Sequence, residues 1–461
     1  MPSRRLVAFA GLLLSLSAVS ASAQVIEPPP RPYRGLFGGG PPPDPTRNRQ
    51  DLVLNGSVMW GYDDSLVPPY GGLPVVPYPA GTTLNWDAGA RYHIGTDARS
   101  LEVKGRGYMN AYSIEGVGPY SGGDQSVRGR TKFGRRTELE VAEDFRFDPY
   151  VTLGLFNTIQ GFDIAATPDA HTSTAVTASR SKTFNGSVMV SEHWNRRTQS
   201  DFGLSYNKQD VNGFALDRSA ISPWVTFEHL MNRHLSVVAA YRGSDSEFQT
   251  FTGVKIPLQE HRVDGGLKYR RKLSATRQLS WSAGAGPQHV IFGEAGVDRG
   301  RYSDYWAPAG YGSIRFDFAR SWSVAGDYRR TVTVLQGITP FPFMTNSALA
   351  TAGGFLNRWF ELVFSAGYSD GQGGQALAGT IVGSYDGVAL TAQGRFRLSR
   401  FWSAVTSYNH FRYYSDPAAA ITLGVPRELQ RNGVRVGVAW ALPLVGQYRA
   451  QPPDVTIDRR D

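Results

Sequence analysis

The regular alternation of apolar and polar residues is the sequence feature that most limits how this chain can fold. It is clearest in four long segments, at residues 84–94, 101–111, 262–270 and 388–398. In the first of them Leu84 and Trp86 alternate with Asn85 and Asp87. Successive side chains of a strand point to opposite faces, so this period predicts strands with one apolar and one polar face. No break in composition follows residue 50 of the 461-residue chain, which favours one continuous β architecture.

The first residues have the pattern of a targeting segment. Arg4 and Arg5 precede the apolar run 6–19, and Ala21-Ser22-Ala23 forms a small-residue cleavage site. We therefore expect residues 1–23 to be a signal peptide that is cleaved before Gln24. No other stretch approaches the ~18–20 apolar residues of a spanning helix. The Pro/Gly-rich residues 24–49 are expected to form a periplasmic linker.

Average composition suggests a soluble protein, but that average is a poor guide for a two-faced sheet. The mean hydropathy is −0.30 and the hydrophobic fraction is 41%. A transmembrane barrel also averages polar, because only its outer face is apolar. The chain has no Cys, which removes thiol catalysis and thiolate metal sites. The formal charge of +9 is spread in mixed-sign pairs, so a nucleic-acid partner is not expected.

Short turns and longer polar segments alternate along the chain. Eight short turns are predicted, at 95–101, 147–153, 195–201, 231–237, 274–281, 319–324, 357–362 and 399–404. Longer segments are predicted at 63–81, 162–182, 289–309 and 414–429. With a first strand at 51–62 and a last at 433–442, the count is about 18 strands, within a range of 16–18. Residues 183–210 and 346–356 leave the hairpin assignment ambiguous.

Trp residues support a barrel rather than a soluble sandwich. Six of them lie in or at the ends of predicted strands: Trp60, Trp86, Trp281, Trp322, Trp402 and Trp440. Trp favours the membrane interface. A sandwich would need a second sheet over the apolar face, and lipid tolerates no open strand edge. The predicted fold class is all-β: a single transmembrane antiparallel β-barrel at 50–445, with short periplasmic turns, long extracellular loops and a periplasmic tail at 446–461.

The final strand resembles the C-terminal signal that the barrel-assembly machinery reads in outer-membrane barrels. In "RVGVAWAL" the spacing of Arg435, Gly437, Trp440 and Leu442 fits a polar-Gly-aromatic-apolar pattern. Many such barrels end on a terminal Phe, whereas this chain continues for residues 446–461. The segment 51–445, with turns such as "FRLSRFWSAVTSYNHFRYYSD", also resembles β-barrel porins associated with exopolysaccharide export. That resemblance implies polysaccharide passage and polysaccharide-export components as partners.

Catalytic and metal-binding patterns are not found in the sequence. None of the eight His forms an HExxH pair, and no GxSxG elbow occurs. We therefore expect no enzyme activity, metal or cofactor. Only about 27 Pro-rich residues precede the first strand, too few for the folded plug of a TonB-dependent transporter.

Charges on the polar face are expected to line a lumen, because Arg or Lys facing lipid near the midplane costs about 2–4 kcal/mol. The pore-lining candidates are Asp87, Arg91, Glu102, Lys104, Arg106, Glu138, Glu140, Arg242, Asp264, Lys268, Arg270, Arg315, Asp317, Asp327, Arg329, Arg395, Arg397 and Arg435. They form either a salt-bridged wall or a basic strip that selects anions, and both can hold together. Neutralising Arg395 and Arg397 would test the basic strip.

The expected function is a porin-like outer-membrane channel for hydrophilic solutes, including anionic or polysaccharide solutes. The alternatives are a non-conducting structural or adhesion barrel plugged by its loops, and a transporter of hydrophobic substrates. Expected partners are outer-membrane lipid and lipopolysaccharide, the barrel-assembly machinery and polysaccharide-export components.

Overall fold

A computed structural model describes the part of the chain that builds the β-structure. The described residues are 49–65, 80–96, 98–113, 119–148, 151–152, 175–177, 180–211, 217–249, 255–274, 276–293, 302–318, 321–334, 342–373, 384–415 and 428–445. The expected signal peptide, nearly all of the linker and the C-terminal tail lie outside them. No helix in these ranges has the length and apolar character needed to cross a membrane.

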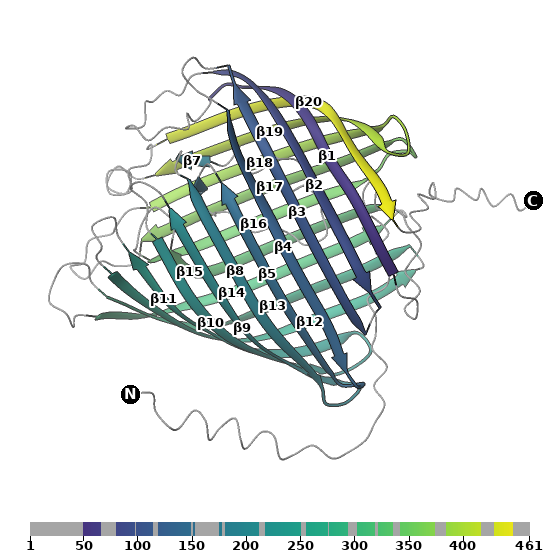
Figure 1. Ribbon diagram of the computed structural model, residues 1–461. Helices are drawn as coiled ribbons and strands as arrows, with labels where there is room; N and C mark the ends of the chain where they lie inside the picture. The colour runs from purple at the N-terminus through teal and green to yellow at the C-terminus, as the bar shows by residue number, and fades with distance from the viewer. Residues whose placement is uncertain are drawn as a thin grey trace, which may run out of the picture.

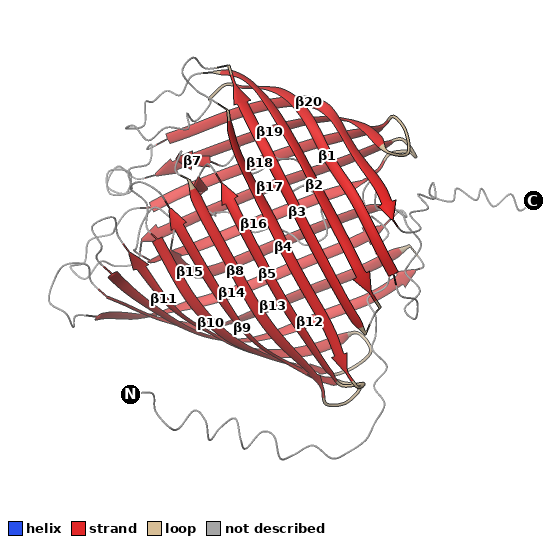
Figure 2. Cartoon of the chain, in the orientation of Figure 1, coloured by secondary structure: helices blue, strands red, loops and turns tan. Residues whose placement is uncertain are grey.

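Eighteen long strands account for almost all of the described residues (Figure 2). They are β1 (Arg49–Asp63), β2 (Gly81–Gly95), β3 (Arg99–Tyr112), β4 (Tyr120–Phe133), β5 (Thr137–Asp148), β8 (Ser181–His193), β9 (Thr198–Val211), β10 (Asp217–Leu230), β11 (Leu235–Gln249), β12 (Lys255–Ser274), β13 (Arg277–Gly293), β14 (Tyr302–Phe318), β15 (Trp322–Val334), β16 (Pro342–Phe355), β17 (Phe360–Gly373), β18 (Ser384–Arg397), β19 (Trp402–Ser415) and β20 (Glu428–Val445). A separate small hairpin pairs β6 (Val151–Thr152) with β7 (Ala175–Thr177).

The sheet closes on itself, because its first and last strands pair. Each long strand is antiparallel to the one before it, and β1 pairs with β20 from Leu52/Val445 to Asp63/Gly433. Figure 1 shows the closure as purple β1 lying beside yellow β20. This pairing leaves neither β1 nor β20 with an open edge, and each unpaired backbone group in lipid would cost several kcal/mol. The predicted 18-stranded transmembrane antiparallel barrel is therefore confirmed.

One end of the barrel is formed by eight short turns, and the start of β1 and the end of β20 lie at this same end. A polar side chain organises several of these turns. The Asn232 Oδ1 accepts the amide N–H groups of His234 (2.9 Å) and Leu235 (3.0 Å). Asn357 and Ser399 bind the two equivalent amides in their own turns. A side-chain oxygen that replaces a backbone acceptor favours a tight turn, which explains the recurring Asn and Ser.

The eighth short turn lies at a different place from the prediction. Residues 147–153 were predicted to be a short turn, and this is wrong: β5 ends at Asp148, at the opposite end of the barrel. The short turn is Gly134–Arg136, between β4 and β5. Its first residue, Gly134, has φ of 68°, a backbone conformation that glycine adopts without strain. The segment predicted at 289–309 is also shorter, because β13 runs to Gly293 and β14 begins at Tyr302.

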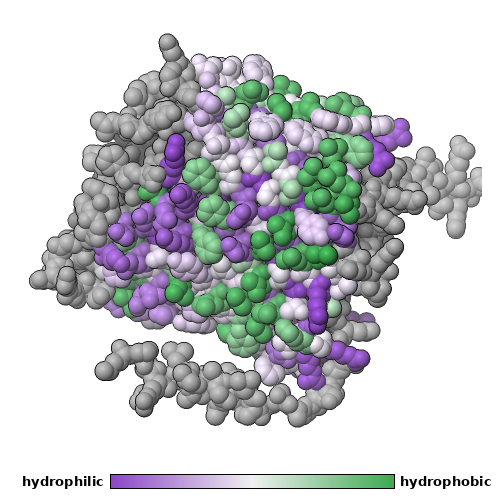
Figure 3. Space-filling model, in the orientation of Figure 1, coloured by the Kyte–Doolittle hydropathy of each residue, from purple (hydrophilic) through white to green (hydrophobic). Residues whose placement is uncertain are grey.

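The two faces of the sheet separate apolar from polar side chains. In β2, Leu84 and Trp86 are 48% and 47% exposed on the outer face, whereas Asn85 and Asp87 on the inner face are 2% and 3% exposed. Figure 3 shows green side chains gathered in an oblique band across the visible face, with purple surface on the side of the long loops. The alternating pattern thus places an apolar belt outside and a polar wall inside, as expected for a barrel in lipid.

Candidate functional site

The inner wall of the barrel carries every charged side chain that the sequence assigned to a lumen. Strand register places the eighteen pore-lining candidates on the face opposite the exposed apolar residues. Arg106 and Arg397, for example, lie on the face opposite Val103 and Phe396. Eighteen strands enclose an interior wide enough for water. The wall is therefore the candidate site.

The first group of charges lies on β2 to β5. Glu102 of β3 binds two cations at once, Arg91 of β2 at 2.5 Å and Lys104 of its own strand at 2.6 Å. On β4 and β5, Arg130 pairs with Glu138, and Arg128 lies 3.6 Å from Glu140. Three of these four ion pairs join neighbouring strands, and the fourth lies within β3.

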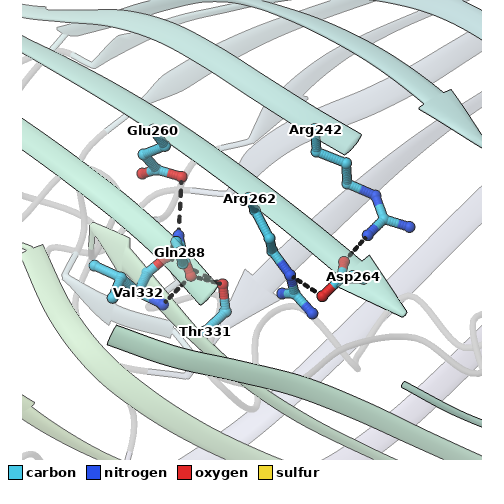
Figure 4. Close-up of polar contacts among 7 residues, drawn as sticks. All are labelled: Arg242, Glu260, Arg262, Asp264, Gln288, Thr331 and Val332. Atoms are coloured by element: carbon cyan, nitrogen blue, oxygen red, sulfur yellow. Dashed lines mark hydrogen bonds and ion pairs between the residues drawn. The ribbon is translucent and has the colours of Figure 1, made fainter. Parts of the chain in front are cut away.

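The second group lies on β10 to β12. The Asp264 carboxylate is 2% exposed and accepts hydrogen bonds from Arg242 at 2.7 Å and Arg262 at 2.8 Å (Figure 4). Lys268 of β12 lies 2.6 Å from Glu228 of β10. Arg270 lies on the same face of β12, two residues closer to the short turn, and is exposed. This group contains more cations than carboxylates.

In these ion pairs the cation is more exposed than the carboxylate. The side chains of Arg91, Arg128 and Arg242 are 57%, 56% and 51% exposed. Their partners Glu102, Glu140 and Asp264 are 18%, 29% and 2% exposed. The same order holds for Lys104, Arg130 and Lys268. Cationic groups therefore lie on the water side of the wall, over carboxylates that lie closer to the backbone.

Other candidates form buried pairs that stiffen the wall. Asp87 accepts a hydrogen bond from Ser57 and lies 3.6 Å from Arg106. Asp317 accepts from Ser323 and from Arg315 at 3.0 Å. Replacing such a pair by apolar residues is often neutral, whereas removing one partner is costly. These two three-residue contacts fit the salt-bridged wall that the sequence predicted.

Arg395 and Arg397 differ from each other in a way that the sequence does not reveal. Arg395 is 8% exposed and lies 3.9 Å from the 1% exposed Glu361. Arg397 is half-buried, and its Nε donates to the backbone oxygen of Ser399 at 3.3 Å. A test of ion preference is therefore better made at Arg128 and Arg242, which face water. Asp327 and Arg329 of β15 lie inward opposite Ser313 and Tyr311 of β14.

Sequence analysis missed several functional candidates on this wall. Arg128, Arg130 and Arg262 were not among the pore-lining candidates, although each alternates with apolar or small neighbours in its strand. In β4 the signal was weak because Gly and Thr, rather than large apolar residues, occupy much of the outer face. Among the described residues, no group of three or more His, Cys, Asp or Glu side chains is placed to hold a metal ion.

An inner apolar layer narrows the lumen at the end opposite the short turns. We use this name for Phe248, Ile256, Leu258, Val290, Phe292, Ala307 and Val332, which are all at most 6% exposed and pack together. Strand β14 pairs with β15 only from Gly310/Arg330 to Phe318/Trp322, while β15 and β16 stay paired up to Val334/Pro342. The paired ends of β15 and β16 therefore separate from β14 and pack, through Val332 and Met344, against the inner face of β11 to β14.

Gln288 of β13 forms hydrogen bonds with the end of β15 that packs inside the barrel. Its Oε1 accepts from the Val332 amide at 3.0 Å and from the Thr331 hydroxyl at 3.1 Å. Its Nε2 donates to the Val332 oxygen at 3.3 Å and to Glu260 at 3.5 Å (Figure 4). The Gln288 side chain thus makes the hydrogen bonds to the Val332 backbone that a paired β14 would otherwise make.

Gln288→Ala is expected to loosen the end of β15. The Val332 amide loses its acceptor in a buried site, which costs about 1–3 kcal/mol. Hydrogen exchange at Val332 should accelerate by roughly ten- to hundredfold, since 1.4 kcal/mol is a factor of ten. Gln278→Ala, on the same face of β13 near the short turns, should leave that rate unchanged. Equal exchange rates in the wild type and Gln288→Ala would show that the contact does not hold the strand end.

Comparisons with known proteins give likenesses in structure only. No protein-family model matches the sequence, and no curated protein matches it. The structure of OccK2 (OpdF) from Pseudomonas aeruginosa aligns with a TM-score of 0.42 at 10% identity, covering 86% of this chain and 98% of that one. OccAB1 from Acinetobacter baumannii aligns with a TM-score of 0.41 at 13% identity, covering 86% and 97%. The fold assignment rests on the strand pairing described above.

Proposed function

We propose that this protein is an outer-membrane channel for the passive passage of hydrophilic solutes, with a preference for anions. The observation that carries the proposal is the exposure of Arg91, Arg128 and Arg242 over their less exposed carboxylate partners. A solute in the lumen meets guanidinium groups before carboxylates, and charged rings of this kind select ions by sign. We do not propose an enzymatic activity.

The membrane location is supported by the closed barrel and its apolar belt. Only a closed barrel satisfies every strand hydrogen bond in lipid, and outer-membrane barrels place short turns in the periplasm. We therefore assign the short-turn end to the periplasm and the opposite end to the cell exterior. The signal peptide expected at 1–23 would deliver the chain there.

A polysaccharide is the finer solute assignment that the sequence resemblance implies. In support, a row of neutral side chains crosses the inner wall on β16 to β19, where Thr351, Ser365, Thr391 and Asn409 are successive partners. Ser365 and Thr391 are half-buried and can reach a solute, whereas Thr351 and Asn409 are 2% and 7% exposed. Such groups hydrogen-bond sugar hydroxyls without a charge preference. An acidic oligosaccharide would use both this row and the exposed cations.

A non-conducting structural or adhesion barrel is the second candidate function. The inner apolar layer favours it, because that layer and the ends of β15 and β16 occupy part of the lumen at the outer end. In that case the charged wall would serve stability alone.

Planar-bilayer recording of the refolded protein tests the channel. We expect stepwise openings, and across a KCl gradient a reversal potential whose sign indicates chloride preference. An oligomer of uronic acids added to one side should reduce the current if acidic sugars bind the wall. The absence of any conductance, in either polarity, would overturn the channel and favour the scaffold.

The proposed partners follow from this location. Outer-membrane lipid and lipopolysaccharide would contact the apolar belt. The barrel-assembly machinery would read Arg435, Gly437, Trp440 and Leu442, which lie together in the closing strand β20. Polysaccharide-export components remain partners only if the solute is a polysaccharide.

A further inference from the structure

Four of the short turns share one local design. Each has an apolar residue, then Asn or Ser, then Arg, then an aromatic or basic residue: Trp194–Arg197, Met231–His234, Leu356–Trp359 and Leu398–Phe401. In the last three turns the Asn or Ser oxygen holds the amides two and three residues ahead. The Asn or Ser side chain therefore organises the turn, and Arg233, Arg358 and Arg400 follow it directly in the sequence.

The Arg side chains in these turns are exposed and stand beside exposed apolar groups. Arg233, Arg358 and Arg400 are all exposed. The residues two positions earlier, Met231, Leu356 and Leu398, are 56%, 58% and 54% exposed, and an apolar side chain of that size is unfavourable in bulk water. The guanidinium carbons of Arg358 and Arg400 lie 5.0 Å and 4.5 Å from the Trp359 and Phe401 rings.

The described residues of the short turns carry charge of one sign. The described turn residues at the short-turn end contain Arg135, Arg136, Arg196, Arg197, Arg233, Arg358 and Arg400, and they contain no Asp or Glu. The four related turns connect β8–β9, β10–β11, β16–β17 and β18–β19, so they lie in two separate sectors of the closed barrel.

We propose that this arginine rim binds the phosphate groups of anionic phospholipids in the inner leaflet of the outer membrane. A leaflet surrounds the whole barrel and meets both sectors at once, whereas a docked protein would meet one. Lipid also fits both the Arg and the apolar residue of each turn. The phosphate pairs with the guanidinium, and Met231, Leu356 and Leu398 lie at the boundary of the acyl chains. The rim borders the apolar belt directly, since Phe396 and Trp402 flank the 398–401 turn and are 49% and 44% exposed. This proposal depends on the membrane location, not on conduction.

The test compares unfolding in two kinds of vesicle. The wild type is refolded into vesicles of phosphatidylcholine, and into vesicles of phosphatidylcholine with one third phosphatidylglycerol. Urea unfolding is followed by Trp fluorescence. We expect a higher urea midpoint in the phosphatidylglycerol vesicles, and we expect the triple variant Arg233→Gln, Arg358→Gln, Arg400→Gln to lose most of that increase.

A matched control uses two exposed lumen cations. The variant Arg128→Gln, Arg242→Gln removes positive charge from inside the barrel and should keep the full increase. The proposal is overturned if the wild type gains nothing from phosphatidylglycerol, or if the triple variant gains as much as the wild type. A gain that appears only with an acidic periplasmic polypeptide, and not with lipid, would also overturn it in favour of a protein partner. Bilayer conductance of the triple variant separates this outcome from a failure of the channel, because the rim substitutions leave the lumen wall unchanged.

Discussion

Replacing Arg128, Arg130 and Arg242 with glutamine is expected to reverse the ion preference of the channel. The three side chains are 56%, 46% and 51% exposed, and each covers a carboxylate that stays in place after the substitution. A charge about 8 Å from a passing ion contributes on the order of 1 kcal/mol at an effective dielectric constant near 40, and less with salt screening. Losing three such contributions should lower the chloride-to-potassium permeability ratio by at least roughly tenfold.

The measurement is the reversal potential across a KCl gradient, at low and high salt. The shift should shrink at high salt, because screening weakens exposed charges. Arg395→Gln is the control: this side chain is 8% exposed beside Glu361, so its loss should reduce stability while leaving the ion preference nearly unchanged. If the triple variant conducts with the wild-type preference, the exposed cations do not set selectivity.

Alternation predicted the strands and the barrel, and the count of short turns predicted about 18 strands. The period of two is a local property, and each strand carries it independently of its partners. The first and last strands were predicted from the same pattern, and their pairing follows once an open edge in lipid is excluded. Short-turn prediction worked where Asn232, Asn357 or Ser399 marks the turn. It was wrong for the β4–β5 connection, where only the backbone freedom of Gly134 marks it.

The sequence predicted which charges face inward but not which of them meet water. Arg242 and Arg395 have the same position in the alternation, yet the first is exposed and the second is buried. That difference depends on neighbouring strands and on what covers the wall, which no local pattern encodes. The contact of Gln288 with Val332 joins residues 44 positions apart and depends on β15 separating from β14. The sequence gives no reason for that separation, because both strands keep their alternation.

The seam between β1 and β20 is where the largest effect on stability is expected, and Arg435→Leu tests it. Arg435 and Asp63 are 2% and 3% exposed, and the Arg435 guanidinium donates to Asp63 at 2.9 Å. The substitution leaves the Asp63 carboxylate buried without this partner, and removing one member of a buried pair costs about 3–5 kcal/mol. We expect a much lower urea midpoint in vesicles and a lower yield of folded barrel.

Two comparisons isolate the cause of this loss. Asp63→Asn combined with Arg435→Leu removes both charges and should recover a large part of the stability, because an uncompensated buried charge costs more than an absent pair. Arg91→Leu breaks the ion pair with Glu102, in which the Arg is 57% exposed, and exposed pairs contribute only about 0–1 kcal/mol. The pair joins residues 372 positions apart, so its loss acts on the contact that brings the two ends of the sheet together. A double variant as unstable as Arg435→Leu alone would instead assign the effect to packing around the Arg435 side chain.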